Sequence, residues 1–417
     1  MQYIIKAPRL LNQTINLPAS KSISNRALII HALSGGRTLP ENLSDCDDTE
    51  VIIRALQNMP DVIDIKAAGT AMRFMTAYLS VLEGHCHTLT GTERMKHRPI
   101  QILVDALRQL GAQIEYVGKE GFPPLRITGK QLEGGLLEIP GNVSSQYISA
   151  LLLIGPVLKK GLTLRLTGDI ISRPYIDLTL SVMHQYGAKV EWSDYDTISV
   201  TPQPYQELNY YIENDWSAAS YWYEIMALSQ GEGDHICLEG LADGSRQGDS
   251  SLRYIFSLLG VKTSFATKEP RRPTMVTLRR SGSPVPRLEY DFVNAPDLAQ
   301  TFVVCCAVMG VPFHFRGLST LRIKETDRIA ALITEMRKLG YVLHDGDGAE
   351  LIWSGERCEP DFSMGIDTYE DHRMALAFAP AALRIDGLRI NNPHVVSKSY
   401  PRYWDDLRSA GFEINEE

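Results

Sequence analysis

The sequence predicts an α/β protein of two domains, in which one unit about the size of a βαβ motif is repeated six times. Six segments share one form: a turn, a small or polar cap, and then an apolar run rich in Ala and Leu. After a short first interval the segments recur roughly every 70–80 residues, a period longer than that of stacked solenoid repeats. A chain of 417 residues is also too long for one compact core, so two domains are expected.

Each of the six segments is expected to begin a buried helix. The caps are Leu17–Arg26, Ala68–Arg73, Gly141–Gln146, Asn214–Ser217, Pro296–Asp297 and Glu370–Arg373, and the apolar runs are Ala27–Leu33, Phe74–Leu82, Tyr147–Ile154, Ala218–Leu228, Leu298–Met309 and Met374–Leu383. Periodicity predicts further helices at Arg98–Leu110, Ile176–Gly187, Ser251–Gly260 and Lys324–Gly340, and strands at Leu162–Thr167, His235–Leu238 and Met275–Leu278.

The first cap is the most informative of the six. Pro18 and Ser20 are turn and N-cap signals. On a helix that begins near Ser20, Ser22 and Arg26 share a face. Free backbone N–H groups and the positive end of the helix dipole attract an anion at a helix N-terminus, and Lys21 adds formal charge there. The segment indicates either an anion site or a solvated, well-capped helix start.

More cations precede other expected helices. They lie in Arg94–Pro99, Lys324–Arg328, Asp371–Arg373 and Ser397–Lys398. Singly, each group is typical of a salt-bridged helix face, and such pairs contribute little to stability. Together, in a chain of formal net charge −8, they predict a positive site for a substrate with several negative charges. Asp297 and Glu325 lie among these cations and are candidates for proton transfer.

Composition excludes several classes of protein. The acidic balance argues against nucleic acid as a partner, and the sequence shows neither a signal peptide nor a membrane-spanning apolar stretch. The six Cys have no framework spacing, so core packing in a reducing compartment is expected. His85-Cys86-His87 is the densest cluster of metal-ligand types, but no second cluster completes it, and no metal is expected. Without a Walker loop or dinucleotide fingerprint, the chemistry is expected to come from side chains and substrate.

Eight motifs resemble those of the 5-enolpyruvylshikimate-3-phosphate synthase family, a member of the enolpyruvyl transferases. They are, in family order, Leu17–Arg26, Ala68–Arg73 (AGTAMR), Arg94–Pro99 (RMKHRP), Val143–Gln146 (VSSQ), Ser172–Asp177 (SRPYID), Ile323–Arg328 (IKETDR), Asp371–Met374 (DHRM) and Ser397–Lys398. The motifs span nearly the whole chain, and AGTAMR, KETDR and DHRM in this order are highly specific as a set.

The resemblance implies the two-domain enolpyruvyl-transferase fold, an inverted α/β barrel. Each domain holds three βαβαββ units, and a cleft between the domains closes on substrate. The chain crosses between the domains twice, so residues 1–18 and 213–417 are expected in one domain and residues 19–212 in an inserted one. A stretch usual in the family is missing between Ala55 and Lys66, so the first unit is expected to be trimmed.

The resemblance also implies a reaction. The enolpyruvyl group of phosphoenolpyruvate is transferred to the 5-hydroxyl of shikimate 3-phosphate, through a tetrahedral intermediate that releases phosphate, on the way to chorismate and the aromatic amino acids. No cofactor and no metal is implied. In this family glyphosate occupies the phosphoenolpyruvate site, and retention of Gly69, Thr70 and Arg73 favours sensitivity to it.

The roles of individual residues follow from the same resemblance. Lys21 contacts the leaving phosphate and donates a proton to it, Asp297 lies next to the attacking hydroxyl, and Glu325 handles the C3 proton. Shikimate 3-phosphate is held by Ser22, Arg26, Ser144, Ser145, Gln146, Ser172, Tyr175, Asp297, Thr320 and Lys324. Phosphoenolpyruvate is held by Lys21, Gly69, Arg98, Gln146, Arg328, Arg373 and Lys398.

Two positions depart from the family pattern, and two alternatives stay open. Ala67 and Thr320 each replace a usual Asn, which weakens substrate contacts more than it changes the reaction. One alternative is the sister transferase that acts on a UDP-amino sugar, but its family carries a Cys in a loop that here, at Arg94–Pro99, has none. The other is a non-catalytic anion-binding protein on the same scaffold. We expect a cytoplasmic monomer whose partners are its two small substrates, without nucleic acid or membrane.

Overall fold

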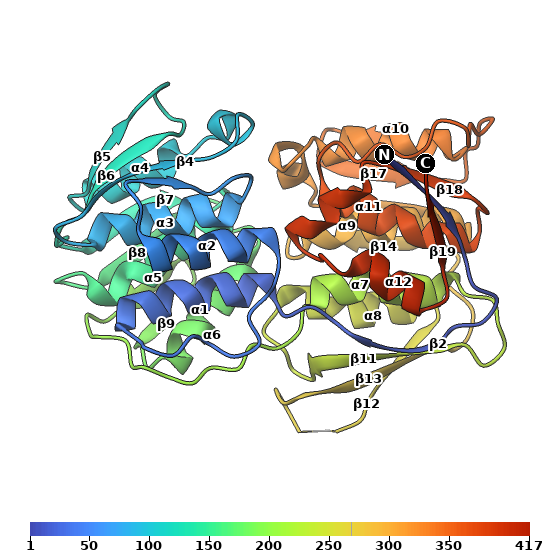
Figure 1. Ribbon diagram of the computed structural model, residues 1–417, viewed down its shortest axis with the longest axis horizontal. Coiled ribbons are helices and arrows are strands. Elements are labelled where there is room, and N and C mark those ends of the chain that lie inside the picture. Colours follow the sequence, from blue (N-terminus) through green and yellow to red (C-terminus); the bar gives the residue numbers. More distant parts are fainter. Residues whose placement is uncertain (268) are drawn as a thin grey trace. The chain divides into compact units, whose positions relative to one another are not determined.

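The computed structural model describes residues 1–267 and 269–417 (Figure 1). The chain divides into two compact units. Unit 1 comprises Met1–Pro18 and Glu213–Glu417, and unit 2 comprises Ala19–Ile212. No helix of the described residues is both long and apolar enough to cross a membrane.

Four of the sheets are copies of one βαβαββ pattern. In each copy the first two strands pair in parallel and the last two close the sheet with antiparallel pairs. The copies are β3(Val62–Asp64), β4(Cys86–Thr90), β5(Gln113–Tyr116), β6(Leu125–Thr128); β7(Gly135–Pro140), β8(Leu162–Thr167), β9(Val190–Trp192), β10(Thr197–Val200); β2(Asn12–Asn16), β11(His235–Ala242), β12(Val261–Phe265), β13(Pro273–Arg280); and β14(Leu288–Asp291), β15(Phe313–Arg316), β16(His344–Gly346), β17(Glu350–Trp353).

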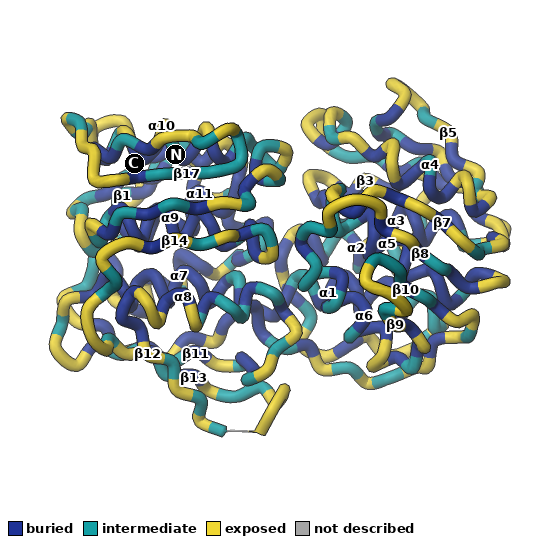
Figure 2. Tube along the Cα trace, turned by 180° about the vertical axis from the view of Figure 1, so that it is seen from behind, coloured by how far each residue is buried: buried dark blue, intermediate teal, exposed yellow. Residues whose placement is uncertain are grey.

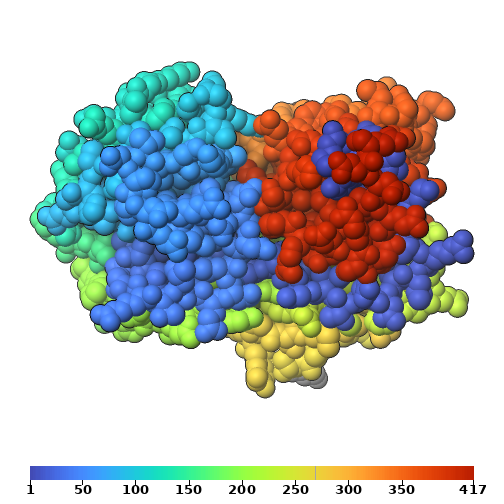
Figure 3. Space-filling model, viewed as in Figure 1, coloured from blue at the N-terminus to red at the C-terminus, as the bar shows by residue number. Residues whose placement is uncertain are grey.

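A fifth copy is completed by the N-terminal strand. β1(Gln2–Lys6) lies between β18(Leu388–Asn391) and β19(Glu413–Glu416), antiparallel to both. An isolated parallel bridge between Ile366 and Ile390, which belongs to β18, takes the place of the first strand of the other copies. Figure 3 shows the consequence on the surface, where dark blue atoms of the N-terminus are surrounded by red atoms of the C-terminal segment. Residues from both ends of the chain therefore form one sheet.

The sixth copy, at the start of unit 2, is trimmed. It keeps both helices, α1(Lys21–Ser34) and α2(Asp47–Asn58), but its strands are reduced, among the described residues, to an isolated bridge between Glu41 and Tyr211. α2 is followed after only three residues by β3 of the next copy. The short first interval of the sequence thus reflects the loss of two closing strands.

The six expected cap-plus-apolar segments all form helices, and these make the cores of the two units. They are α1, α3(Gly69–Val81) and α5(Ser145–Ile154) in unit 2, and α7(Trp216–Leu228), α9(Ala299–Met309) and α11(His372–Phe378) in unit 1. α3 packs against α1 and α5, and α9 packs against α7 and α11. Figure 2 shows these helices mostly in the colour of buried residues. The helices are buried on most faces because they pack between neighbouring helices and the sheets of their units.

Each copy has a second helix: α2, α4(Gln101–Gln109), α6(Arg173–Gln185), α8(Leu252–Leu258), α10(Arg328–Lys338) and α12(Tyr403–Ser409). The sequence predicts four of them, α4, α6, α8 and α10, and each of these starts or ends at other residues than predicted. The predicted start at Lys324 is wrong, because Asp327 is the N-cap of α10 and its carboxylate accepts the Ala330 N–H. Lys324 and Glu325 therefore precede the helix, where their side chains are not confined to one helical face.

Candidate active site

An ionic cluster in unit 1 unites charged residues from four separate segments. Arg328 is at its centre, with a side chain only 2% exposed. Its Nη1 donates to Asp297 Oδ1 at 2.9 Å and its Nη2 to Glu325 Oε2 at 2.9 Å. Its Nε and Nη2 donate to the two oxygens of Asp371 at 2.7 and 3.2 Å. Burial alone would lower the pKa of Arg328, but the charges of these three carboxylates raise it, so the guanidinium stays ionised.

Asp297 lies at the meeting point of three cations. It sits in a 3₁₀ turn, Pro296–Leu298, just before α9, and does not cap that helix. Besides Arg328, Lys324 Nζ lies 3.4 Å from its Oδ1, and Arg373 Nη2 donates to its Oδ2 at 3.1 Å. Burial would raise the pKa of Asp297, but the charges of Arg373, Lys324 and Arg328 together hold it well below the usual value. The carboxylate is therefore ionised and strongly held.

Glu325 bridges two cations from distant parts of the chain. Its Oε1 accepts from Lys398 Nζ at 2.7 Å, while its Oε2 accepts from Arg328. Its side chain keeps 16% of its surface exposed, more than Arg328 or Lys398. A carboxylate at the exposed side of two fixed cations is well placed to exchange a proton with a bound substrate.

The site also includes Asp371, Tyr221 and Asp249, which the sequence does not predict as site residues. Asp371 is fully buried, caps α11 through the Arg373 N–H at 3.0 Å and holds Arg328 with both oxygens. The hydroxyl of Tyr221, on α7, lies 3.3 Å from Arg373 Nη1. Asp249 is buried and accepts a hydrogen bond from the Ser217 hydroxyl. The DHRM motif could have pointed to Asp371, but no local pattern marks the other two.

Asp249 gives a prediction about stability and pH. Burial raises its pKa to about 6, so the folded protein binds a proton there that the unfolded chain has already lost. Stability from this group is present below about pH 4 and is lost as the pH rises through about 6. We therefore expect Asp249→Asn to become more stable relative to the native protein as the pH rises, by roughly 2 kcal/mol between about pH 4 and about pH 7.5. Urea unfolding at both pH values measures this, and a difference that does not change with pH would contradict it.

In unit 2, Lys21 begins α1 directly after its N-cap. Ser20 caps the helix by accepting the Ile23 N–H, as predicted. Lys21 Nζ lies 3.3 Å from Asp48 Oδ2, and the two side chains are 17% and 4% exposed. Ser22 follows on the same turn, and its carbonyl accepts from Arg26 Nη1 at 2.8 Å. Lys21 is thus an oriented, partly exposed cation at a helix N-terminus.

Arg26 is held from inside unit 2. Its Nε donates to Thr179 Oγ1 at 2.7 Å, and its Nη2 lies 3.2 Å from both Ser149 Oγ and the Tyr175 carbonyl. Burial lowers its pKa to about 10, which still leaves the guanidinium ionised at neutral pH. Its N–H groups bind neutral oxygens, and among the described residues no carboxylate forms an ion pair with it.

Gly69, Arg98 and Gln146 come together at the start of α3. A Cβ atom on Gly69 would lie 2.6 Å from Arg98 Nη1, so the absence of a side chain there lets the guanidinium reach the helix N-terminus. The Gln146 amide donates to Thr70 Oγ1 at 3.1 Å and so joins α5 to the same place. Arg73, one turn further on, donates to the Gly69 and Pro99 carbonyls, which fixes the loop that carries Arg98.

The remaining predicted residues of unit 2 lie at two other helix starts. Ser144 caps α5 by accepting the Gln146 N–H at 3.4 Å, with Ser145 as the first helical residue. Ser172 precedes α6 with a positive φ of 54°, and its carbonyl accepts the Tyr175 N–H. Ser144, Ser145 and Tyr175 are half-buried, whereas Ser172 is buried.

The two departures from the family pattern have different surroundings. Ala67 is exposed. Thr320, in the 3₁₀ turn Ser319–Ile323 of unit 1, has a buried hydroxyl for which the described residues supply no hydrogen-bond partner. A buried hydroxyl without a partner is costly, so this oxygen is a candidate for a substrate contact.

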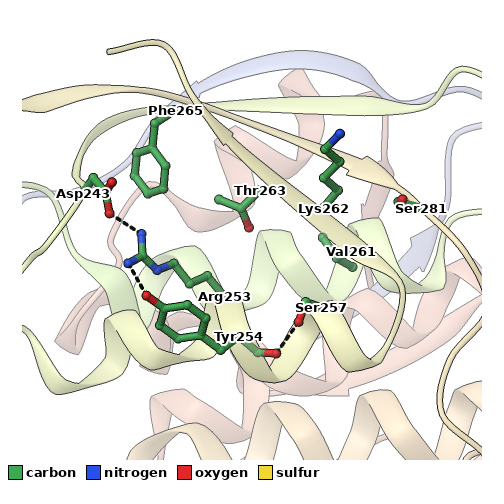
Figure 4. A pocket seen from close by; sticks show the side chains of 9 residues that line it. All are labelled: Asp243, Arg253, Tyr254, Ser257, Val261, Lys262, Thr263, Phe265 and Ser281. Atoms are coloured by element: carbon green, nitrogen blue, oxygen red, sulfur yellow. Dashed lines mark hydrogen bonds and ion pairs between the residues drawn. The ribbon is translucent and has the colours of Figure 1, made fainter. Parts of the chain in front are cut away.

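Pockets elsewhere in unit 1 do not include these residues. One, of about 540 Å³, is lined by Asp243, Arg253, Tyr254, Ser257, Val261, Lys262, Thr263, Phe265 and Ser281. Figure 4 shows the Arg253 guanidinium there between the Asp243 carboxylate and the Tyr254 hydroxyl, so its charge is already compensated. In another, Arg280 and Arg384 donate to carbonyls at the C-terminus of α7, as helix caps do.

Among the described residues, neither a metal-binding group nor a disulfide is found at these sites. No group of three His, Cys, Asp or Glu among them could hold a metal ion. All six Cys are free, and Cys305 and Cys306 are buried in α9 as predicted. The rings of His85 and His87 stack on each other, and His87 Nδ1 lies 2.8 Å from the Pro60 carbonyl.

Comparisons with known proteins find matches along nearly the whole chain. The family model described as EPSP synthase (3-phosphoshikimate 1-carboxyvinyltransferase) matches residues 5–63 and 58–407. A 3-phosphoshikimate 1-carboxyvinyltransferase of Bacteroides fragilis (strain ATCC 25285) is 61% identical over 414 residues, which are 99% of each chain. One from Photobacterium profundum is 36% identical and covers 95% of this chain and 96% of the relative.

Solved structures show the same fold at lower identity. EPSP synthase from Acinetobacter baumannii matches with a TM-score of 0.79 and 21% identity over 100% of both chains. The enolpyruvyl transferase NikO from Streptomyces tendae matches with a TM-score of 0.72 and 16% identity over 99% of this chain and 98% of that one. The expected two-domain enolpyruvyl-transferase fold is thus confirmed, and the full-length family match and the relatives together show that this chain belongs to the EPSP synthase family.

Proposed function

We propose that the residues described above transfer the enolpyruvyl group of phosphoenolpyruvate to the 5-hydroxyl of shikimate 3-phosphate, with release of phosphate. The observation that carries the proposal is the cluster in which Asp297 and Glu325 share Arg328, flanked by Lys324, Arg373 and Lys398. Its cations suit a substrate with a carboxylate and a phosphate, and its carboxylates suit proton transfer. The family match and the relatives support the same reaction, a transferase step in the biosynthesis of aromatic amino acids.

We assign the binding of phosphoenolpyruvate to cations of both units. In unit 1 these are Arg328, Arg373 and Lys398, and in unit 2 Lys21 and Arg98, with the Gln146 amide and the backbone at Gly69. In unit 1 the anion has to share these cations with Asp297 and Glu325. Binding therefore weakens the ion pairs that hold the two carboxylates and makes both better bases at the moment substrate is present.

The addition step joins the two substrates. The 5-hydroxyl oxygen forms a bond to C2 of the enol phosphate, and its proton passes to Asp297. Because the bound anion weakens the ion pairs of Glu325, this carboxylate takes up a proton from solvent and gives it to C3, where the C2=C3 electron pair forms the new C–H bond of the tetrahedral intermediate. While Asp297 is ion-paired as in the structure it is a poor base, because its pKa is held well below the usual value. The step therefore requires that the substrate anion compete with Asp297 for Arg328 and Arg373.

The elimination step reverses the proton transfer at C3. Glu325 takes a proton from C3, the C2=C3 bond re-forms and the bond from C2 to the phosphate oxygen breaks. Lys21 protonates the leaving phosphate. Electrostatic stabilisation of the departing phosphate by oriented cations is the largest contribution expected in such a site.

Shikimate 3-phosphate is assigned to hydroxyl groups and cations of both units. Ser22, Ser144, Ser145 and Ser172 lie at helix starts of unit 2, where N–H groups and hydroxyls suit a phosphate. Arg26 adds a charge whose partners in the described part of the chain are neutral oxygens, and Gln146 and Tyr175 lie near these serines in the sequence. In unit 1, Asp297, Thr320 and Lys324 are assigned to the ring hydroxyls. The free thiols fit the reducing cytoplasm as the place of action.

The acceptor specificity tests the proposal against its alternatives. Phosphate release from phosphoenolpyruvate should depend on shikimate 3-phosphate, and a UDP-amino sugar should not replace it. Release supported by the UDP-amino sugar alone would favour the sister transferase. Tight binding of both anions without any phosphate release would favour the non-catalytic alternative.

Gly69 gives a prediction about inhibition by glyphosate. In Gly69→Ala the new methyl group would lie 2.6 Å from Arg98 Nη1, so the guanidinium has to move away from the start of α3. Because phosphoenolpyruvate and the inhibitor both use this place, we expect a higher KM for phosphoenolpyruvate and roughly tenfold or greater weakening of glyphosate inhibition. Steady-state inhibition kinetics measure both, and inhibition should be competitive with phosphoenolpyruvate. An unchanged inhibition constant in Gly69→Ala would rule out the steric account.

A further inference from the structure

Three side chains of α10 hold the segment that leads into α11. Glu335 is fully buried, and its two oxygens accept from the Tyr369 hydroxyl at 2.6 Å and from the Asp367 N–H at 3.0 Å. Lys338 Nζ lies 2.7 Å from Glu335 Oε2 and donates to the Gly365 carbonyl at 3.1 Å and to Asp367 Oδ2 at 2.8 Å. Arg328, two turns before Glu335, binds Asp371. We call Arg328, Glu335 and Lys338 the α10 clamp.

The clamped segment has a strained backbone. Tyr369 and Glu370 have φ angles of 52° and 56°, and neither is glycine. Two consecutive L-residues in the left-handed region are rare and persist only where the surroundings hold them. The strained pair comes directly before Asp371, which caps α11. The clamp therefore holds the backbone that sets where the Asp371 carboxylate lies.

Asp371 connects this segment to the cations Arg328 and Arg373 of the ionic cluster. Its Oδ1 accepts the Arg373 N–H and an Arg328 N–H, and its Oδ2 accepts the Arg328 Nε–H. Arg328 in turn donates to Asp297 and Glu325. A shift of the segment at Asp367–Tyr369 would thus move two guanidinium groups assigned to phosphoenolpyruvate. Misplacement of a binding group by about 1 Å can cost about a hundredfold in rate.

We propose that Glu335 is a positioning residue, which sets Arg328 and Arg373 for phosphoenolpyruvate by holding the strained segment before Asp371. Glu335 contacts Lys338, Asp367 and Tyr369, and so is linked to Asp371 through the backbone of Asp367–Asp371. The inference rests on the proposed function, because it assumes that Arg328 and Arg373 bind phosphoenolpyruvate. It assigns to the interior of α10 a role that its amphipathic sequence does not indicate.

Glu335→Gln tests the proposal with a matched control. The amide keeps the shape but removes the charge that faces Lys338. With its oxygen toward the Asp367 N–H, its N–H groups meet the Tyr369 hydroxyl, which then has to accept instead of donate, so the charge-assisted contacts that fix the segment are weakened. We expect kcat/KM for phosphoenolpyruvate to fall about tenfold or more, mostly through KM, while the KM for shikimate 3-phosphate changes less than about threefold. The control is Asp234→Asn, which changes a buried carboxylate of the same unit that accepts two backbone N–H groups, from Leu11 and Gly231.

Several outcomes separate the possibilities. If both variants lose thermal stability but only Glu335→Gln raises the KM for phosphoenolpyruvate, the positioning role is supported. If the two variants differ from the native protein only in melting temperature, Glu335 is structural and the inference is wrong. Should Glu335→Gln fail to fold, Tyr369→Phe removes one of the same hydrogen bonds, and it should raise the same KM by a smaller factor. An inactive native protein would overturn the proposed function instead.

Discussion

In the variant Glu325→Gln, kcat should fall by roughly two to four powers of ten, because the amide can neither give nor take the C3 proton. Both steps of the proposed reaction use this carboxyl group, so the loss should slow addition and elimination alike. The amide oxygen can still accept from Lys398 or Arg328, which now lie 2.7 and 2.9 Å from the two carboxylate oxygens. Shikimate 3-phosphate should therefore still bind, and calorimetry with that ligand checks this.

A matched control separates chemistry from loss of an ion pair. Glu350 accepts from His314 at 2.7 Å in a partly exposed pair of unit 1, outside the ionic cluster. Glu350→Gln makes the same chemical change, and kcat should stay within about twofold of the native value, as for surface ion pairs in general. Near-normal turnover in Glu325→Gln would show that the proton is handled by another group.

Lys21→Met should reduce both binding and turnover, with kcat/KM for phosphoenolpyruvate lower by roughly two to three powers of ten. In the proposed reaction the lost ammonium group stabilises the reacting phosphate and protonates it as it leaves. Unlike Gln for Glu, Met leaves no polar group in place of the one that is removed. Steady-state kinetics at saturating shikimate 3-phosphate measure the loss.

The same change also removes the partner of a buried carboxylate. The side chain of Asp48 is 4% exposed and lies 3.3 Å from Lys21 Nζ, so Lys21→Met leaves a charge without its cation. The double variant Lys21→Met with Asp48→Asn should regain thermal stability but not activity. Recovery of activity in the double variant would mean that Lys21 acts by holding Asp48 and not by contacting phosphate.

The sequence predicts the helix starts because their signals are local. Ser20, Asp215 and Asp371 are caps within a few residues of the apolar runs that they precede, and all three cap helices in the structure. The motif KETDR marks Glu325 and Arg328 for the same reason. The helix predicted from Lys324 begins instead at Arg328, since the Asp327 carboxylate competes successfully for the first free N–H groups.

The pairings within the cluster could not be predicted in this way. Arg328 meets Asp297 and Asp371, which lie 31 and 43 residues away, and Lys398 meets Glu325 across 73 residues. Only the repeated βαβαββ topology brings these helix starts together. Glu335 is the clearest case, since an acid in a helix with charged neighbours is typical of an exposed face, whereas this one is fully buried against a segment 32 residues further on.

The proposed reaction can be followed as a whole in a single NMR experiment. ³¹P NMR of the purified, chelator-treated protein with both substrates follows phosphoenolpyruvate, shikimate 3-phosphate and inorganic phosphate at once. We expect phosphoenolpyruvate to disappear and free phosphate to appear in equal amounts, with the 3-phosphate retained on an enolpyruvyl product, and no change when either substrate is omitted. Phosphate formed without shikimate 3-phosphate, or a reaction that needs an added metal or cofactor, would contradict the account.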